Sequence, residues 1–205
     1  MNLLGALVGA GQTELPLVYS REAVVFPGSI VPLLASTKFA VAAADEAMRG
    51  DKLVAVALLK SSGDERKAEI EVHEIATVSR IVQHVRLPDG SLRLLVEGER
   101  RIRIKKSVFK KDHLDALVEA LPPDASGGAE LDATLRLVRK SFGQYADLAK
   151  KVPPETLLAA DRAREPHELC DVVGNVLNLK AERKQELLSP LSGSERLEVL
   201  EAALE

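Results

Sequence analysis

The sequence has few aromatic residues and a single cysteine. Aromatic side chains make up 3% of its 205 residues, and tryptophan is absent. Surfaces on which nucleic-acid bases stack need such side chains, so they are scarce here. Cys170 alone cannot form an internal disulfide. This cysteine usage is typical of a reducing compartment, and we therefore expect a cytoplasmic protein.

Strong net charge and long apolar runs are also lacking. The formal net charge is −3, which argues against a protein whose main task is to bind nucleic acid. No apolar run approaches the ~18 residues of a membrane span, so no membrane partner is expected. With 46% hydrophobic and 29% charged residues, the chain can form a packed core of one large or two small domains.

Signatures of three kinds of catalytic or metal site are missing from the sequence. A P-loop needs a Gly-Lys pair to bind phosphates, and no such pair occurs. The G-x-S-x-G pattern of a serine nucleophile is absent. His167 and Cys170 are three residues apart, but two ligands do not complete a zinc site. We therefore expect no catalytic residue, no metal site and no cofactor in this chain, and consider an independent hydrolase the weakest alternative.

The first large part of the chain, residues 14–121, predicts β-structure. Its clearest strand is Val54–Leu59, a continuous apolar run that indicates burial on both faces. Pro27-Gly28 predicts a tight turn, and Pro32 predicts an edge strand because proline cannot donate to a central ladder. Leu87–Gly90 predicts a hairpin turn. The other expected strands are 75–86, 92–96, 100–104 and 113–121.

One helix interrupts this β-rich part. Ser36 or Thr37 can cap it, residues 39–49 carry it, and Gly50 ends it. Apolar residues at helical spacing predict its buried face, namely Val41, Ala44 and Met48. Phe39 falls on roughly the opposite side of the helix. Phe26 and Phe39 are therefore either core residues or members of an exposed apolar patch on which a peptide docks.

The remainder of the chain predicts helices. Residues 122–128 (PPDASGG) have the composition of a linker, and residues 129–205 follow the helical period. A heptad-like seam predicts one long helix that packs along its whole length: Leu131, Leu135, Val138, Phe142, Tyr145, Ala149 and Val152. Shorter helices are expected at 155–164, 166–178, 181–188 and 193–205. Residues 1–13 predict a flexible leader, and the last helix lacks a stop signal, so we expect it either to end there or to continue into a further domain.

A cluster of basic residues spans Arg100–Lys111. Arg101, Arg103 and Lys105 would share one face of a strand. One interpretation is a solvated edge strand that cationic side chains protect from aggregation. The alternative is an anion patch that binds nucleic acid or another polyanion.

Three segments together resemble the N-terminal region of the bacterial Lon proteases. The first shows the Val-Val-Phe-Pro-Gly run at 24–28, the second Leu-Pro-Asp-Gly at 87–90 with Val-Glu-Gly at 96–98, and the third Lys-Gln-Glu-Leu-Leu at 184–188. Their order and spacing cover residues 14–205. The sequence departs from the family where Arg21-Glu22 stands for Arg-Asp, and where the segment after Leu34 keeps only Lys38 as a charge.

The resemblance implies an α+β protein with a PUA-like β-barrel lobe, containing one helix, at residues 14–121. An all-α helical bundle lobe at 129–205 would follow it. In the family this region recognises unfolded or damaged proteins and is continued by an AAA+ ATPase domain and a Ser–Lys protease domain, in a homo-hexamer. ATP and Mg would then bind only in the ATPase domain. The implied substrate-binding candidates are Phe26, Phe39 and Lys38, and a PUA-like nucleic-acid binder is the alternative function.

Overall fold

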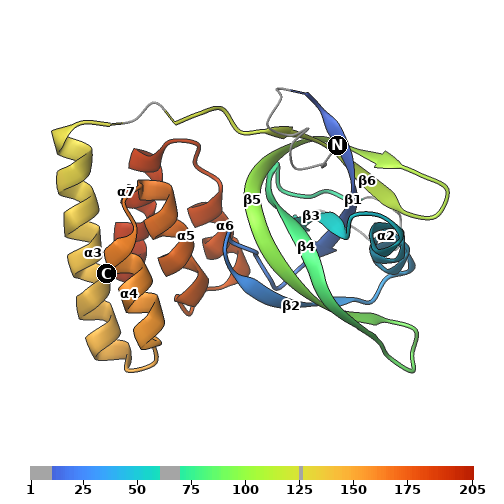
Figure 1. Cartoon of the computed structure of the whole chain (residues 1–205), viewed down its shortest axis with the longest axis horizontal. Coiled ribbons are helices and arrows are strands. Elements are labelled where there is room, and N and C mark those ends of the chain that lie inside the picture. Colours follow the sequence, from blue (N-terminus) through green and yellow to red (C-terminus); the bar gives the residue numbers. More distant parts are fainter. Residues whose placement is uncertain (1–10, 61–69, 125–126) are drawn as a thin grey trace. The chain divides into compact units, whose positions relative to one another are not determined.

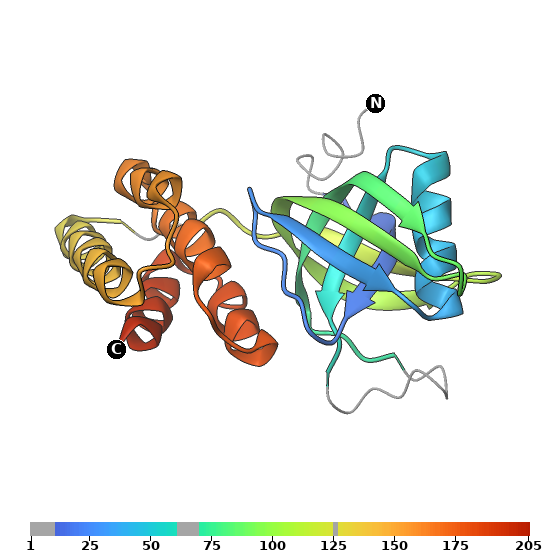
Figure 2. The same cartoon turned by 90° about the horizontal axis from the view of Figure 1, so that it is seen from below.

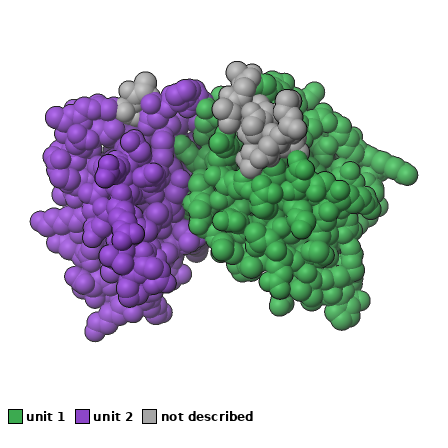
Figure 3. Space-filling view, in the orientation of Figure 1, with its two compact units in different colours: residues 1–121 green, residues 122–205 purple. Residues whose placement is uncertain are grey.

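The computed structural model describes residues 11–60, 70–124 and 127–205. The chain forms two compact units, Met1–Leu121 and Pro122–Glu205 (Figure 3). Most of the expected leader and two residues of the expected linker lie outside the described residues, and strand β1 already begins at Thr13. None of the helices in the described ranges has the length and apolar character that a membrane crossing requires.

The first unit contains one mixed six-stranded sheet and helix α2 (Lys38–Arg49). The strands are β1 (Thr13–Ser20), β2 (Ile30–Ala35), β3 (Leu53–Leu58), β4 (Ile75–Arg86), β5 (Leu92–Phe109) and β6 (Leu114–Ala120). They are ordered β2-β5-β4-β3-β1-β6, and β5 pairs with β6 as well. The strand pairings that lead from β5 through β4, β3, β1 and β6 therefore end again at β5. Figures 1 and 2 show the resulting curvature of the sheet, with α2 beside it.

Strand β3 lies at the centre of the apolar core. All six of its residues are buried, which confirms the prediction of a strand buried on both faces. It pairs in parallel with β1 and antiparallel with β4. Alternate residues of β5, among them Leu92, Leu94 and Val96, complete the same core. The side chains between them, Arg93, Leu95 and Glu97, lie on the opposite face of β5, which is exposed or half-buried. This face is part of the surface described below.

The predicted turn at Pro27-Gly28 is confirmed. The Ser29 N–H donates to the Phe26 carbonyl across 3.1 Å, and Gly28 has a φ of +74°. Glycine tolerates this left-handed conformation, and proline presets the φ before it. A Cβ on Gly98 would lie only 2.3 Å from the Phe26 carbonyl oxygen. The turn therefore packs against a β5 position that only glycine can occupy.

Strand β5 differs from the expected pair of strands at 92–96 and 100–104. It is one strand of 18 residues, because Glu97 and Gly98 continue the pairing with Arg80 and Ser79 on β4. The ladder with β4 has a register shift beside this point, between Val78 and Ser79, which is typical of a β-bulge.

Helix α2 begins as predicted but buries a different face. The Ala40 N–H donates to the Thr37 hydroxyl across 3.2 Å, so Thr37 is the cap. The buried residues are Ala40, Ala43, Ala44 and Ala47, whereas Val41 and Met48 are only partly buried. The expected stripe was therefore wrong in part. Small alanine side chains allow the helix backbone to approach the sheet closely, so the buried face is the alanine face that includes Ala44 of the predicted stripe.

The second unit consists of five helices. They are α3 (Ala129–Ala149), α4 (Pro154–Arg162), α5 (Pro166–Val176), α6 (Ala181–Leu188) and α7 (Gly193–Leu204). The four shorter ones match their predicted ends to within two residues. In α3 only part of the expected seam is buried, with Ala146 in place of Tyr145. The helix stops before Val152 because Lys150 adopts a left-handed φ of +52°.

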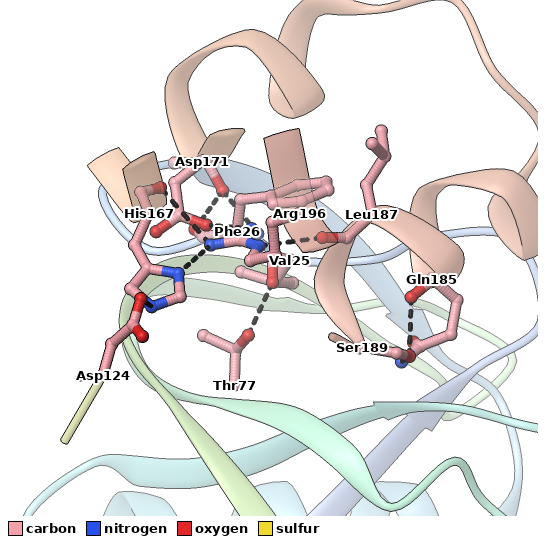
Figure 4. Close-up of polar contacts among 11 residues, drawn as sticks. Val25, Phe26, Thr77, Asp124, His167, Asp171, Gln185, Leu187, Ser189 and Arg196 are labelled. Carbon is pink, nitrogen blue, oxygen red and sulfur yellow. Dashed lines mark hydrogen bonds and ion pairs between the residues drawn. The ribbon is translucent and has the colours of Figure 1, made fainter. Parts of the chain in front are cut away.

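A buried arginine joins three helices of this unit (Figure 4). The guanidinium of Arg196 on α7 is fully buried and donates to the Leu187 carbonyl at 2.9 Å and to the Asp171 carboxylate at 2.7 Å. It also lies 3.3 Å from the carbonyl oxygen and from Nδ1 of His167. The Nε2 atom of His167 lies 3.0 Å from the Asp124 carboxylate. Four side chains of the second unit thus form one polar network.

Candidate functional site

Strand β2 presents an open edge in the first unit. Among the described residues its one strand partner is β5, which it meets antiparallel from Ile30 opposite Glu97 to Ala35 opposite Leu92. Ile30 and Leu34 are 59% and 57% exposed, and Pro32 between them is exposed as well. Pro32 therefore lies on an edge strand, as the sequence predicted.

The direction of the β2 backbone groups follows from the ladder. The Gly98 N–H on β5 donates to the Ser29 carbonyl across 2.9 Å. Hydrogen-bonded and non-hydrogen-bonded pairs alternate along an antiparallel ladder. Ile30, Pro32 and Leu34 therefore direct their backbone groups away from β5, toward the open edge. Proline is tolerated at position 32 because its missing N–H is not needed by β5.

The outer surface of β2 continues across two more strands as an exposed apolar surface, the β2 face. Its apolar residues are the exposed Ile30, Pro32 and Leu34 on β2, the half-buried Leu95 on β5 and the exposed Val85 on β4. The register aligns these residues in rows, with Leu34 and Val85 on either side of Arg93 and with Pro32 beside Leu95. Exposed apolar residues gathered on one face in this way, here around Arg93, make the β2 face a candidate binding surface.

A groove of about 390 Å³ runs beside this edge. Its lining comes from the end of β1 and the following loop (Tyr19–Ala23), from Pro32–Leu34, and from the start of α2. The Tyr19 hydroxyl lies 2.8 Å from the Thr37 hydroxyl, which ties the end of β1 to the cap of α2. The groove wall is thus held by packed elements of the same unit.

Phe39 is half-buried and forms a second apolar group, the aromatic pair, with the exposed Phe109. Their ring centroids are 5.4 Å apart in an edge-to-face arrangement, and Phe109 at the end of β5 is 56% exposed. The Lys38 ammonium lies 5.3 Å from the centroid of the Phe39 ring. This geometry brings the predicted Phe39 and Lys38 together and adds Phe109, which the sequence analysis did not single out.

Phe26 is fully buried. Its backbone N–H and carbonyl both bond the Ser29 hydroxyl, at 3.1 and 2.6 Å, and the Thr77 hydroxyl donates to the neighbouring Val25 carbonyl at 2.6 Å (Figure 4). The interpretation of Phe26 as an exposed docking residue is therefore not supported, and its role in the described chain is packing.

The residues of the expected anion patch have acidic neighbours. One carboxylate oxygen of Glu119 lies 3.4 Å from Arg103 and 3.5 Å from Lys105. Arg101 also has an interaction partner. Cations that are paired with carboxylates attract phosphates weakly. The anion patch stays a prediction, and the local charge balance does not favour it.

A polar groove of about 610 Å³ lies between the end of α2, the start of β1 and the β5–β6 hairpin. His113 is buried there, with its ring nitrogens 2.9 Å from Asp112 and 3.2 Å from Asp115. Burial raises the pKa of the Asp115 carboxyl, although nearby His113 and Lys110 oppose the rise. The hydrogen bond that the Lys110 ammonium donates to the Glu14 carboxylate raises the pKa of Lys110. The hydrogen bond with His113 lowers the pKa of the Asp112 carboxyl. Because its opposite charges pair with one another, this cluster suits a structural role at the hairpin.

The sequence analysis missed most of the β2 face. Pro32 indicated an edge strand, but its presence alone does not show which neighbouring side chains that strand exposes. The available signal was the composition of residues 30–35 (IVPLLA), which are apolar at both alternating sets of positions. One-sided burial of such a strand necessarily leaves apolar side chains on the other face.

Known proteins share both the sequence and the fold of this chain. The family model for the ATP-dependent protease La (LON) substrate-binding domain matches residues 14–205. The Lon protease of Brucella suis biovar 1 (strain 1330) is 38% identical over 178 residues, which are 87% of this chain and 22% of that protein. The Lon protease of Azospirillum brasilense is 35% identical over 190 residues, covering 93% of this chain and 24% of that protein.

Two solved structures have the same fold. The N-terminal domain of Mycobacterium avium complex Lon protease aligns with a TM-score of 0.76 at 24% identity, covering 94% of this chain and 98% of that one. The Lon N-terminal domain protein from Xanthomonas campestris aligns with a TM-score of 0.62 at 20% identity, covering 93% and 98%. The chain spans about a quarter of the length of its curated relatives. From the family match over residues 14–205, the chain belongs to the Lon substrate-binding domain family.

Proposed function

We propose that this chain is the substrate-recognition region of an ATP-dependent serine protease of the Lon type. It would bind unfolded or damaged proteins and deliver them to an ATPase and protease core. The observation that carries the proposal is the family match over residues 14–205. The β2 face supports it, because unfolded proteins expose apolar segments that folded proteins bury.

The physical mechanism is weak, repeated contact. One small apolar surface holds a client loosely and releases it readily. In the proposed cytoplasmic homo-hexamer, six copies near one pore would raise the effective concentration of binding surfaces around a client. ATP and Mg would act in the AAA+ domain, which we propose as a neighbour of this region in the full-length protein.

We also propose the two-lobe description of the region. Residues 14–121 would form the PUA-like β-barrel lobe, and residues 129–205 the helical bundle lobe. The ladders that return from β6 to β5 support a closed barrel. The division of the chain at Leu121 and Pro122 supports the lobe boundary.

The β2 face is the proposed primary contact with clients. The test titrates the chain with a fluorescently labelled protein that is kept unfolded by reduction and alkylation. The double substitution Ile30→Ser and Leu34→Ser should weaken binding about fivefold or more, since each side chain contributes roughly 1 kcal/mol when a client covers it partly. The matched control is Leu148→Ser with Leu158→Ser, which removes exposed leucines from the helical unit. Equal affinity of both variants would refute the assignment.

The aromatic pair is the proposed secondary contact. Phe39→Ala should weaken binding of the same unfolded protein about two- to threefold, because it removes an aromatic surface and the edge partner of Phe109. An unchanged thermal midpoint would show that the fold is intact. Unchanged affinity in the titration would remove Phe39 and Lys38 from the binding surface.

A further inference from the structure

We propose that β2 binds an extended segment of the client as an additional strand of the sheet. The inference rests on the proposed function and specifies how the client is held. Strand addition needs an edge whose backbone groups are unpaired, and main-chain hydrogen bonds then give affinity that does not depend on the client's sequence. That independence suits a site that must accept many different unfolded chains.

The open edge offers a defined set of backbone groups. Ile30 and Leu34 each direct an N–H and a carbonyl away from β5, and Pro32 directs a carbonyl only, as the alternation from the Ser29–Gly98 hydrogen bond requires. Within the described residues, these three positions have no backbone partner outside their own ladder. An extended peptide can therefore accept two and donate three hydrogen bonds along this edge.

The surroundings of the edge suit a strand with apolar side chains. Side chains of an added strand that point to the outer surface would lie beside Ile30 and Leu34, which are both more than half exposed. Side chains that point the other way would enter the 390 Å³ groove, which is walled by Tyr19–Ala23 and the start of α2. The side chains on both faces of an added strand would therefore contact residues of the first unit.

A second copy of this chain is a poor occupant of the edge. Strand β2 has six residues, so the edge is about 20 Å long. Pairing along it covers far less than the ~800 Å² per partner of a stable dimer. Pro32 also removes one donor from any β2–β2 pairing, and edge prolines are a known protection against edge-to-edge association. The occupant that fits is a short, reversibly bound segment of an unfolded polypeptide.

Backbone N-methylation tests the proposal directly. The probe is a fluorescein-labelled octapeptide of alternating valine and threonine with a terminal lysine, and its affinity for the whole chain is measured by fluorescence anisotropy. Two derivatives carry N-methyl groups on either set of alternate residues. Strand addition uses the amides of only one set, so one derivative should lose at least tenfold in affinity while the other keeps the parent affinity within twofold. The set that fails identifies the peptide residues whose amides face β2.

Other outcomes separate this inference from the proposed function. Equal loss, or no loss, for both derivatives would overturn strand addition. If the chain binds the alkylated unfolded protein but not the parent peptide, strand addition is also overturned and client binding stands. If it binds neither, the proposed function fails as well.

A gain-of-contact variant provides an independent measurement. Pro32→Ala restores an N–H on the open edge without touching a bond to β5. Affinity for the parent peptide should rise at least threefold, and the chain should self-associate more readily in sedimentation experiments. Unchanged or weaker peptide binding by the folded variant would overturn the proposal.

Discussion

The two units use polar groups in opposite ways. The helical unit buries a charged side chain, Arg196, and surrounds it with acceptors from α5 and α6. The β-rich unit has an apolar core around β3 and leaves its unpaired backbone groups at the exposed edge of β2. A buried charge that keeps all its partners fixes one arrangement of helices, whereas an open edge can accept further partners. The comparison suits a structural role of the Arg196 network in the helical unit and supports the proposed binding role of the β2 face in the β-rich unit.

Loss of the Arg196 side chain is expected to have the largest effect. Arg196→Met keeps much of the side-chain volume but leaves the Asp171 carboxylate and the Leu187 carbonyl without their donor. Breaking a buried pair in this way costs about 3–5 kcal/mol of unfolding free energy. Denaturant unfolding of the whole chain, combined with hydrogen exchange, should show the loss in α5 and α7 while β3 keeps its protection.

The control for that measurement is an exposed ion pair of the same unit. Arg183→Met breaks the contact between Arg183 and Glu186 on α6, which is half-exposed. Exposed pairs contribute about 1 kcal/mol or less, so this variant should stay close to the parent. A similarly small effect of Arg196→Met would show that the buried network does not hold the helices together.

Gly98→Ala is the corresponding test of the β-rich unit. Its Cβ would lie 2.3 Å from the Phe26 carbonyl oxygen and 2.9 Å from a Val25 methyl group. Such overpacking against backbone costs about 1–3 kcal/mol, occasionally more. The expected result is a lower unfolding midpoint with reduced exchange protection at the start of β2, which lies beside Gly98. An unchanged midpoint would mean that the Pro27-Gly28 turn can move away from β5.

Gly143→Ala should act in the other direction. Gly143 lies inside α3 (Ala129–Ala149), and a Cβ at this position would meet nothing within 4 Å. Replacing an interior helix glycine by alanine stabilises the helix by about 0.5–1 kcal/mol. A rise in the free energy of unfolding of the helical unit should follow. A fall would indicate that α3 needs the flexibility of Gly143.

The sequence predicted local structure well where one residue type determined the backbone. Pro27-Gly28 and Leu87–Gly90 each formed the expected turn, with positive φ at Gly28 and Gly90. The helices of the second unit followed from their period and from Pro153-Pro154. Strand β5 was harder to predict, because a glycine inside a strand is locally ambiguous. Gly98 serves a close contact with the Phe26 carbonyl, which lies 72 residues away in the sequence.

The candidate site was harder to predict because exposure depends on pairing partners. Phe26 and Phe39 look alike in the sequence, yet Phe26 is buried beside its turn while Phe39 meets Phe109 from another strand. The buried partners of Arg196 come from positions up to 29 residues away. No local pattern identifies such contacts, since they arise only when the elements pack.

The smallest expected effect concerns the ionisation of the Asp115 carboxyl at the β5–β6 hairpin. The charged or titratable groups near it are His113, Lys110 and Glu14. Burial raises the pKa of the Asp115 carboxyl, so the folded state favours its neutral form. Stability that this group provides at low pH is then lost as the pH rises through its folded pKa. Asp115→Asn removes the ionisation, and its stability relative to the parent should therefore increase from about pH 3 to pH 7.

Asp112→Asn provides the control of opposite sign. The hydrogen bond with His113 lowers the pKa of the Asp112 carboxyl, so its ionised form stabilises the folded state above the ordinary pKa. This variant should lose stability relative to the parent over the same rise in pH. Thermal unfolding midpoints of both variants at several pH values measure the two slopes. If the slopes share one sign, burial at Asp115 and the hydrogen bond at Asp112 do not shift the two pKa values in opposite directions, and the hairpin does not bury Asp115 enough to favour its neutral form.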